Sequence, residues 1–284
     1  MGEKLMKYYV LYNPIAGGGV AEQEVKKLDG ILSGEIAYFD VTQIQDYQAF
    51  MQGLAEDGIV VICGGDGTLN RFVNNAKDAL QGRKVLYFAC GSGNDFLRDV
   101  EHTDGQPVEL NPYIENLPVV SVNGKEYYFL NGVGYGIDGY CCEVGDELRL
   151  KSDKSVNYAG IAIKGLLFHY KPTGATVIVD GKEYRFEKVW LAPTMNGRFY
   201  GGGMLPAPEQ RRENDKVSVM LFHGSGKLKS LMMFPSIFKG EHVKYEKHIT
   251  VLSGNEITVK FDEPRALQID GETIRNVSEY TARK

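Results

Sequence analysis

Three glycine-rich segments in the first hundred residues have the composition of phosphate-binding loops. They are Asn13 to Gly19, Gly64 to Asn70 and Gly91 to Phe96. Glycine lets the backbone turn tightly and brings its N–H groups close to a ligand. Each segment approaches the start of a helical pattern, and a helix N-terminus adds unpaired N–H groups and partial positive charge. One such loop could be a simple turn, but three of them indicate a nucleotide site.

Two of these loops also contain an aspartate, Asp66 and Asp95. A carboxylate next to a phosphate is repulsive unless a cation lies between them, so the two acids predict Mg²⁺. Either acid could instead cap a helix. The chain has no Walker A motif, and the G-x-G-x-x-G match from Gly134 to Gly139 is a weak dinucleotide signal because it follows an Asn-Gly hairpin strand.

The first third of the chain alternates between strand-like and helix-like patterns. Apolar runs at 7–13, 35–39, 59–63 and 85–90 are separated by segments whose apolar residues recur every three or four positions. Continuous apolar strands between helices predict a parallel sheet covered on both faces. We therefore predict an α/β nucleotide-binding domain over residues 1–118, with its ligand where the strands end.

From residue 119 the pattern becomes mainly antiparallel β. Asn123-Gly124 and Asp180-Gly181 are hairpin dipeptides flanked by strand-like residues. Other segments expected to be regular are strands at 217–222, 249–252 and 257–261 and helices at 156–169 and 228–238. These patterns predict a mainly antiparallel β domain from 119 to 275.

Composition and charge exclude several classes of protein. The 284 residues are 43% hydrophobic and 24% charged, which is typical of a globular chain of about two domains. A net charge of -5 argues against a nucleic-acid partner. The sequence has no bilayer-spanning apolar run, no apolar signal core near the N-terminus and no C-x-x-C pair among its four cysteines. We therefore expect a cytoplasmic protein with reduced thiols.

The glycine loops resemble those of the diacylglycerol kinase catalytic family, which includes sphingosine kinases and bacterial lipid kinases. The G-G-D-G-T-L-N run at 64–70 is a highly specific match, and 91–96, 131–134 and 270–272 match further motifs in the same order. The resemblance covers nearly the whole chain. It implies an ATP-dependent kinase that phosphorylates the hydroxyl of a lipid alcohol, diacylglycerol or a relative, in phospholipid biosynthesis. It also implies that the second domain is a β-sandwich that holds the lipid substrate, and that the active site lies between the two domains, with residues 276–284 returning to the first.

The resemblance assigns a role to each matching position. Glu272 is expected to be the general base and Asp138 to orient the lipid hydroxyl. Asp66 and Asp95 would hold Mg²⁺-ATP. A structural Mg²⁺ site of the family matches Arg212, Asp215 and Val217. The residues expected around ATP are Asn13, Pro14, Ile15, Ala16, Gly17, Thr42, Gly64, Gly65, Asp66, Gly67, Thr68, Leu69, Asn70, Ser92, Asn94 and Asp95.

The chain departs from the family pattern at three positions. Many bacterial members carry lysine where this chain has Gly18, so one phosphate-neutralising charge is missing. The Asp-Gly usual at the structural metal is Asp215-Lys216, and a frequent later aspartate is Ser218. These changes weaken the structural-metal prediction more than the nucleotide prediction.

Two other functions stay open. An NAD kinase shares the G-G-D-G-T loop but should lack the G-S-G-N-D-F-L-R run. A non-catalytic nucleotide- or lipid-binding protein could keep the fold, although the intact Asp66, Asp95 and Glu272 favour an enzyme. The segment from Lys227 to Lys247 mixes lysines with large apolar residues. It is either a helix packed on the β domain or a peripheral contact with the inner membrane surface. Whether two copies form a homodimer is left open.

Overall fold

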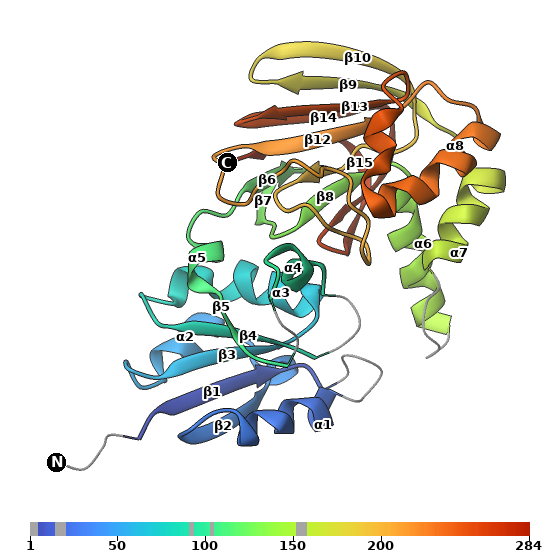
Figure 1. Cartoon of the computed structure of the whole chain (residues 1–284). Helices are drawn as coiled ribbons and strands as arrows, with labels where there is room; N and C mark the ends of the chain where they lie inside the picture. Colours follow the sequence, from blue (N-terminus) through green and yellow to red (C-terminus); the bar gives the residue numbers. More distant parts are fainter. Residues whose placement is uncertain (1–4, 15–20, 91–93, 103–104, 152–157) are drawn as a thin grey trace. The chain divides into compact units, whose positions relative to one another are not determined.

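The computed structural model describes residues 5–14, 21–90, 94–102, 105–151 and 158–284 (Figure 1). The chain divides after Asn116 into two compact units. The boundary lies two residues before the predicted one. Each unit is built around its own sheet, so the two are described in turn.

The first unit is a five-stranded sheet with the strand order β2-β1-β3-β4-β5. The pairs β1·β2, β1·β3 and β3·β4 are parallel, and the short β5 is antiparallel to β4. Its elements are β1 (Lys7–Tyr12), α1 (Ala21–Val25), η2 (Lys26–Gly30), β2 (Glu35–Asp40), η3 (Val41–Gln43), α2 (Tyr47–Gln52), β3 (Ile59–Gly64), α3 (Asp66–Ala76), η4 (Lys77–Ala79), β4 (Val85–Ala89), α4 (Asp95–Asp99), β5 (Val108–Glu109) and α5 (Asn111–Ile114).

The four predicted strands of this unit are confirmed, each to within one residue at either end. Strand β3 is buried along its whole length, as its unbroken apolar run requires. Helix α3 turns Leu69, Phe72, Val73 and Ala76 inward, at the spacing of three and four residues that the sequence pattern of this region predicts. The antiparallel β5 was not predicted, because two residues carry no detectable pattern.

The second unit is a ten-stranded antiparallel sheet in the order β13-β12-β11-β8-β14-β15-β6-β7, with β9 beside β14 and β10 beside β9. Its elements are β6 (Val119–Val122), β7 (Lys125–Tyr128), β8 (Gly132–Tyr135), α6 (Ile137–Lys151), α7 (Tyr158–Lys164), η5 (Gly165–His169), β9 (Thr173–Val179), β10 (Lys182–Val189), β11 (Thr194–Met195), β12 (Val217–Phe222), α8 (Lys227–Met233), η6 (Phe234–Lys239), η7 (Glu241–Lys244), β13 (Ile249–Gly254), β14 (Glu256–Ile269) and β15 (Glu272–Arg283). The predicted fold class, an α/β domain followed by an antiparallel β domain, is confirmed.

Both predicted two-residue hairpins are present. Asn123-Gly124 and Asp180-Gly181 have positive φ at both positions, as the hairpin turn that follows strand twist requires. Asp270-Gly271 forms a third turn of this kind, with φ of 46° and 95°. It joins β14 to β15 and makes Glu272 the first residue of β15.

The C-terminal strand corrects one expectation. Residues 276–283 lie in β15, which pairs with β14 and β6 of the second unit, and so do not return to the first sheet. The physical reason is burial, since Val277, Tyr280 and Ala282 are part of the apolar core of the second unit.

Helix α6 was missed by the sequence reasoning. The segment from Gly134 to Gly139 runs from the end of β8 into the first turn of this helix, whose 15 residues end at Lys151. Close packing requires glycine at position 139, because a Cβ there would lie 2.0 Å from the carbonyl oxygen of Ala266. This glycine therefore lets α6 pack directly on the backbone of β14.

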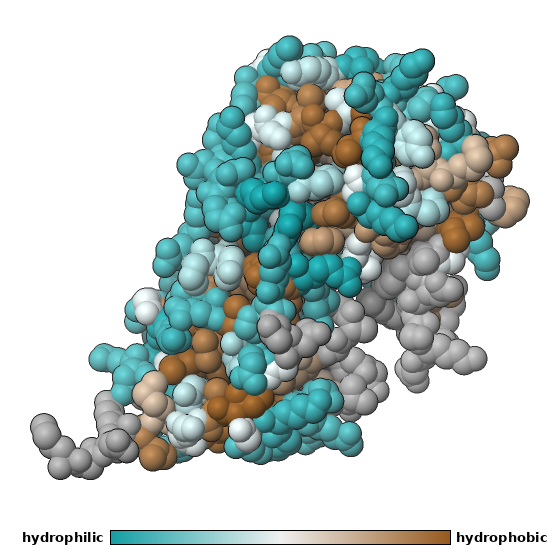
Figure 2. Space-filling model, in the orientation of Figure 1, coloured by the Kyte–Doolittle hydropathy of each residue, from teal (hydrophilic) through white to brown (hydrophobic). Residues whose placement is uncertain are grey.

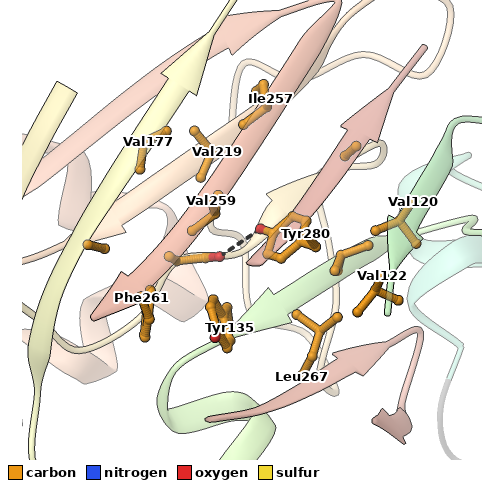
Figure 3. Close-up of a cluster of buried hydrophobic side chains, with 14 of the residues drawn as sticks. Val120, Val122, Tyr135, Val177, Val219, Ile257, Val259, Phe261, Leu267 and Tyr280 are labelled. Atoms are coloured by element: carbon orange, nitrogen blue, oxygen red, sulfur yellow. Dashed lines mark hydrogen bonds between the residues drawn. The ribbon is translucent and has the colours of Figure 1, made fainter. Parts of the chain in front are cut away.

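The core of the second unit combines aliphatic side chains with a few buried aromatic ones, shown in Figure 3. Tyr280 lies at its centre, 1% exposed. Its hydroxyl is 2.8 Å from Oγ1 of the fully buried Thr194 and 3.3 Å from the carbonyl oxygen of Ala192. Buried polar groups are stable only when they are hydrogen-bonded, so this hydroxyl helps to fix where β15 meets β11.

We predict that Tyr280→Phe lowers the free energy of unfolding by about 1–3 kcal/mol, because Thr194 then loses its partner inside the core. Urea unfolding measures the change. Tyr184→Phe, which removes the hydroxyl of a partly buried tyrosine on β10, is the matched control. Equal stabilities of the two variants would show that the Thr194 contact contributes nothing.

Candidate functional site

The ends of three neighbouring strands form one cavity in the first unit. Asn13 follows β1, Thr42 follows β2, and Thr68 lies in the first turn of α3, after β3. All three line a cavity of about 230 Å³. The other lining residues are Val41, Ile44, Gln45, Tyr47, Ile62, Arg71, Phe72 and Asn75. The structure thus brings together three of the residues expected around ATP.

The start of α3 has the geometry of an anion site. Gly65 is its N-cap residue, in an extended conformation and without a side-chain cap. A Cβ at Gly64 would lie 2.5 Å from Cβ of Thr68, so only glycine fits there. Leu69 and Asn70, in the same helix, are buried. N–H groups in the first turn of a helix attract phosphate, which accounts for the G-G-D-G-T composition.

Asp66 connects two of the predicted loops. Its carboxylate accepts hydrogen bonds from the backbone N–H of Asp95 at 2.8 Å and of Phe96 at 3.1 Å. It therefore caps α4, a helix that begins 29 residues later. Asp95 is 4% exposed and lies 3.9 Å from the guanidinium of Arg98. The structure thus brings the two acids together, because the side chain of Asp66 contacts the backbone of Asp95.

The acids fit a nucleotide-bound Mg²⁺ by their chemistry. Among the described residues, no group of three or more His, Cys, Asp or Glu side chains surrounds a metal position. Mg²⁺ in nucleotide sites is usually held by one or two carboxylates together with the phosphates, which Asp66 and Asp95 can supply. Pro14 and Asn94 lie within the described residues, beside their loops. Ile15, Ala16, Gly17, Gly18 and Ser92 lie outside them.

Asp138 is a buried acid in the first turn of α6. Its Oδ1 accepts from the backbone N–H of Gly139 at 2.9 Å, and the hydroxyl of Tyr200 donates to Oδ2 at 3.3 Å. Burial raises the pKa of Asp138 to about 6, against the opposing effect of these hydrogen bonds. A Cβ at Gly134 would lie 1.5 Å from Oδ2, so that glycine provides the space for the carboxylate.

Asp270 is a site residue whose role the sequence did not reveal. Its carboxylate accepts hydrogen bonds from three successive backbone N–H groups, those of Leu130 at 2.6 Å, Asn131 at 2.8 Å and Gly132 at 2.9 Å. The motif at 270–272 pointed to Glu272, which is exposed at the start of β15. Asp270 instead holds the turn on which that glutamate sits. The sequence signals for Asp270 were its place in the motif at 270–272 and the Asp-Gly dipeptide that is typical of hairpin turns.

The residues expected at a structural Mg²⁺ site do not fit a metal ion. The carbonyl oxygen of Arg212 accepts a hydrogen bond from the ammonium of Lys284, which also donates to Oδ1 of Asn196 at 2.8 Å. The guanidinium of Arg212 donates to Asn131 and Leu130, and Val217 lies in the β12–β13 ladder opposite Gly254. The ammonium of Lys284 therefore already contacts the carbonyl oxygen of Arg212, one of the groups expected beside the ion.

A cavity of about 450 Å³ in the second unit lies beside the first turns of α6. Gly136 and Tyr140 line it, together with Tyr170 and Arg265. Among the described atoms, the buried hydroxyl of Tyr170 and Nε of Arg265 have no hydrogen-bond partner. The lining is therefore suited to a hydrated or polar group rather than to an acyl chain.

Two protein-family models match this chain, one over each unit. The diacylglycerol kinase catalytic domain matches residues 7–117, and the YegS C-terminal NAD kinase beta sandwich-like domain matches residues 131–281. The chain belongs to the diacylglycerol kinase catalytic-domain family. The resemblance inferred from the glycine loops is thereby confirmed.

Individual diacylglycerol kinases are similar along most of this chain. One from Mycobacterium tuberculosis is 26% identical over 257 residues, 85% of this chain and 81% of its own length. One from Bacillus subtilis is 26% identical over 231 residues, 77% and 72%. A solved structure of a diacylglycerol kinase from Bacillus anthracis superposes with a TM-score of 0.61 at 18% identity, covering 99% of this chain and 95% of that one. At that identity the structure shows a shared fold.

The buried Asp138 gives a pH prediction. Its pKa rises from 3.8 to about 6 in the folded state, so the folded protein holds this proton more tightly than the unfolded chain. The ionised carboxylate therefore costs stability, and this cost is absent below about pH 4 and complete above about pH 6. Asp138→Asn should stabilise the fold by up to about 3 kcal/mol at pH 8 and by about half of that at pH 5.

Urea unfolding at the two pH values measures this effect. Glu209→Gln, which removes an exposed carboxylate from the same unit, should change stability little at either pH. A constant difference between Asp138→Asn and the wild type from pH 5 to pH 8 would contradict the raised pKa.

Proposed function

We propose that the protein transfers the γ-phosphoryl group of ATP to the hydroxyl of a lipid alcohol, diacylglycerol or a close relative. The observation that carries the proposal is the match of residues 7–117 to the diacylglycerol kinase catalytic domain, with the specific G-G-D-G-T-L-N loop at the start of α3. The related proteins named above are diacylglycerol kinases, which favours that acceptor.

The first unit supplies the nucleotide site in this proposal. Asn13, Thr42 and Thr68 line the cavity at the strand ends, and the first turn of α3 offers N–H groups to the phosphates. Mg²⁺ bound with the nucleotide would offset the charge that develops on the transferred group. Asp66 has two tasks here, since the carboxylate that would face the ion also caps α4.

The second unit supplies the groups that act on the alcohol. The hydroxyl must lose a proton as it attacks, which requires a carboxylate within hydrogen-bond reach. Glu272 is exposed on a turn held in place by Asp270, so it is positioned without being desolvated. Asp138, whose pKa of about 6 leaves it ionised at neutral pH, can accept a hydrogen bond from the same hydroxyl and orient it.

A soluble nucleotide substrate is the alternative acceptor. The model that matches residues 131–281 is described as NAD kinase beta sandwich-like, so the second unit alone does not separate the two acceptors. The diacylglycerol kinase model matched by the first unit does favour a lipid. A binding protein without activity would need no general base, and Glu272 is present.

Labelled ATP offered with Mg²⁺ and a whole-lipid extract tests the proposal. We expect label in one class of lipid phosphate, with none transferred to NAD in a parallel reaction. Label in NAD alone would replace the lipid assignment, and label in neither would favour the non-catalytic protein.

Glu272→Gln tests the base. The amide keeps the shape of the side chain but cannot take a proton, so turnover should fall by roughly 10²–10⁴ while ATP affinity barely changes. Glu256→Gln, at the exposed start of β14, should leave both quantities unchanged. If folded Glu272→Gln keeps its turnover, another group removes the proton. If it loses ATP affinity as well, Glu272 serves the nucleotide.

A further inference from the structure

An apolar patch is exposed on the second unit around α8, and we call it the docking patch. Its largest members are Phe168 in η5, at 72% exposure, and Leu228 and Met232 in α8, at 70% and 68%. Ile163 and Phe238 are also exposed. Figure 2 shows hydrophobic surface gathered at the right-hand edge of the second unit, where Figure 1 places α8. Exposed apolar clusters of this kind mark interaction surfaces.

Helix α8 buries one side against the second unit and exposes apolar side chains on the other. Ser230 and Met233 are buried against the unit. Leu228 and Met232, four residues apart, share the opposite face and point outward. Helix α8 also packs against η5, so the apolar side chains of the two elements form one surface. Packing on the second unit therefore explains the buried side of α8 but not its exposed apolar side.

The charge around the docking patch is opposite to that of the whole chain. Residues 227–247 contain five lysines and two glutamates, in a protein with a net charge of -5. Lys229 lies in α8 beside Leu228 and is exposed, as is Lys239 at the end of η6. A basic rim around an apolar centre is the pattern of elements that insert into the headgroup region of anionic membranes.

We propose that the docking patch binds the surface of an anionic phospholipid bilayer, with Phe168, Leu228 and Met232 inserted and the lysines against the headgroups. A second copy of the chain fits less well, because its lysines would meet the same lysines. No helix in the described part of the chain is long and apolar enough to cross a bilayer, so this contact is interfacial. The inference rests on the proposed function, since a kinase acting on a lipid must reach its substrate at a membrane.

Co-sedimentation with vesicles tests the docking patch without nucleotide. We expect binding to phosphatidylglycerol-containing vesicles, weak binding to pure phosphatidylcholine, and release by salt. Leu228→Gln with Met232→Gln should reduce binding at least tenfold. Lys229→Gln with Lys239→Gln should reduce it about fivefold for each lysine removed.

Matched controls lie elsewhere on the second unit. Leu148→Gln changes an exposed leucine of α6, and Lys125→Gln with Lys182→Gln changes exposed lysines at two hairpins. Full vesicle binding by the Leu228/Met232 variant would overturn the proposal. So would a wild-type protein that binds no vesicles but self-associates, if the Leu228/Met232 variant abolishes that self-association. Phosphorylation of a short-chain diacylglycerol in detergent micelles tests the proposed function separately, because it needs no bilayer.

A second inference concerns Lys284. Its ammonium donates to the carbonyl oxygen of Arg212 and to Asn196. Burial and the charge of Arg212 lower the pKa of Lys284, against the opposing effect of the Asp215 and Glu213 carboxylates. The geometry points to an ammonium that replaces the structural Mg²⁺ expected at Asp215. The changes to Lys216 and Ser218 agree with this, since Ser218 bonds to Gln210 and Ser253 rather than facing an ion.

Thermal unfolding without nucleotide tests this replacement. Millimolar Mg²⁺ and a chelator should both leave the Tm of the wild type unchanged. Lys284→Met should lower it by about 2–6 °C, because two oxygen acceptors lose their donor. Lys125→Met, an exposed lysine on β7, is the control. Stabilisation of the wild type by Mg²⁺, or an unchanged Tm in Lys284→Met, would overturn the inference.

Discussion

One carboxylate fixes the part of the second unit on which the proposed chemistry depends. Asp270 accepts three successive backbone N–H groups at the entry to β8, and it does so from the turn that precedes Glu272. Those N–H groups are only partly accessible to water, so without the carboxylate they would lack acceptors at a cost of about 1–3 kcal/mol for each group. The turn, the entry to β8 and the orientation of Glu272 are therefore set together.

The same region shows how close backbone packing makes room for a buried charge. Gly134 leaves space for the carboxylate of Asp138, and Gly139 lets α6 rest on the backbone of β14. Larger residues at either position would push α6 away and open Asp138 to water. An acid that destabilises the fold when ionised is tolerated here because the elements around it hold one another in place, a combination typical of functional sites.

The sequence predicted what depends on local patterns. The first-unit strands, the hairpins at Asn123 and Asp180, and the gathering of Asn13, Thr42 and Thr68 all followed from periodicity, turn chemistry or motif order. It could not predict contacts between distant segments, such as the cap that Asp66 places on α4 or the bond from Lys284 to Arg212. Helix α6 was not predicted because glycines at 134, 136 and 139 precede and interrupt its first turn, which hides the start of the helix in the sequence.

Strand β14 also sets the order in which the two units can fold during synthesis. It pairs with β8, β9 and β15, so it links strands made more than 75 residues earlier to the last part of the sheet. A growing chain can complete the first sheet once β5 has left the ribosome. The second sheet must wait with its strand edges unpaired, which makes this stage the one most exposed to aggregation and most dependent on chaperones.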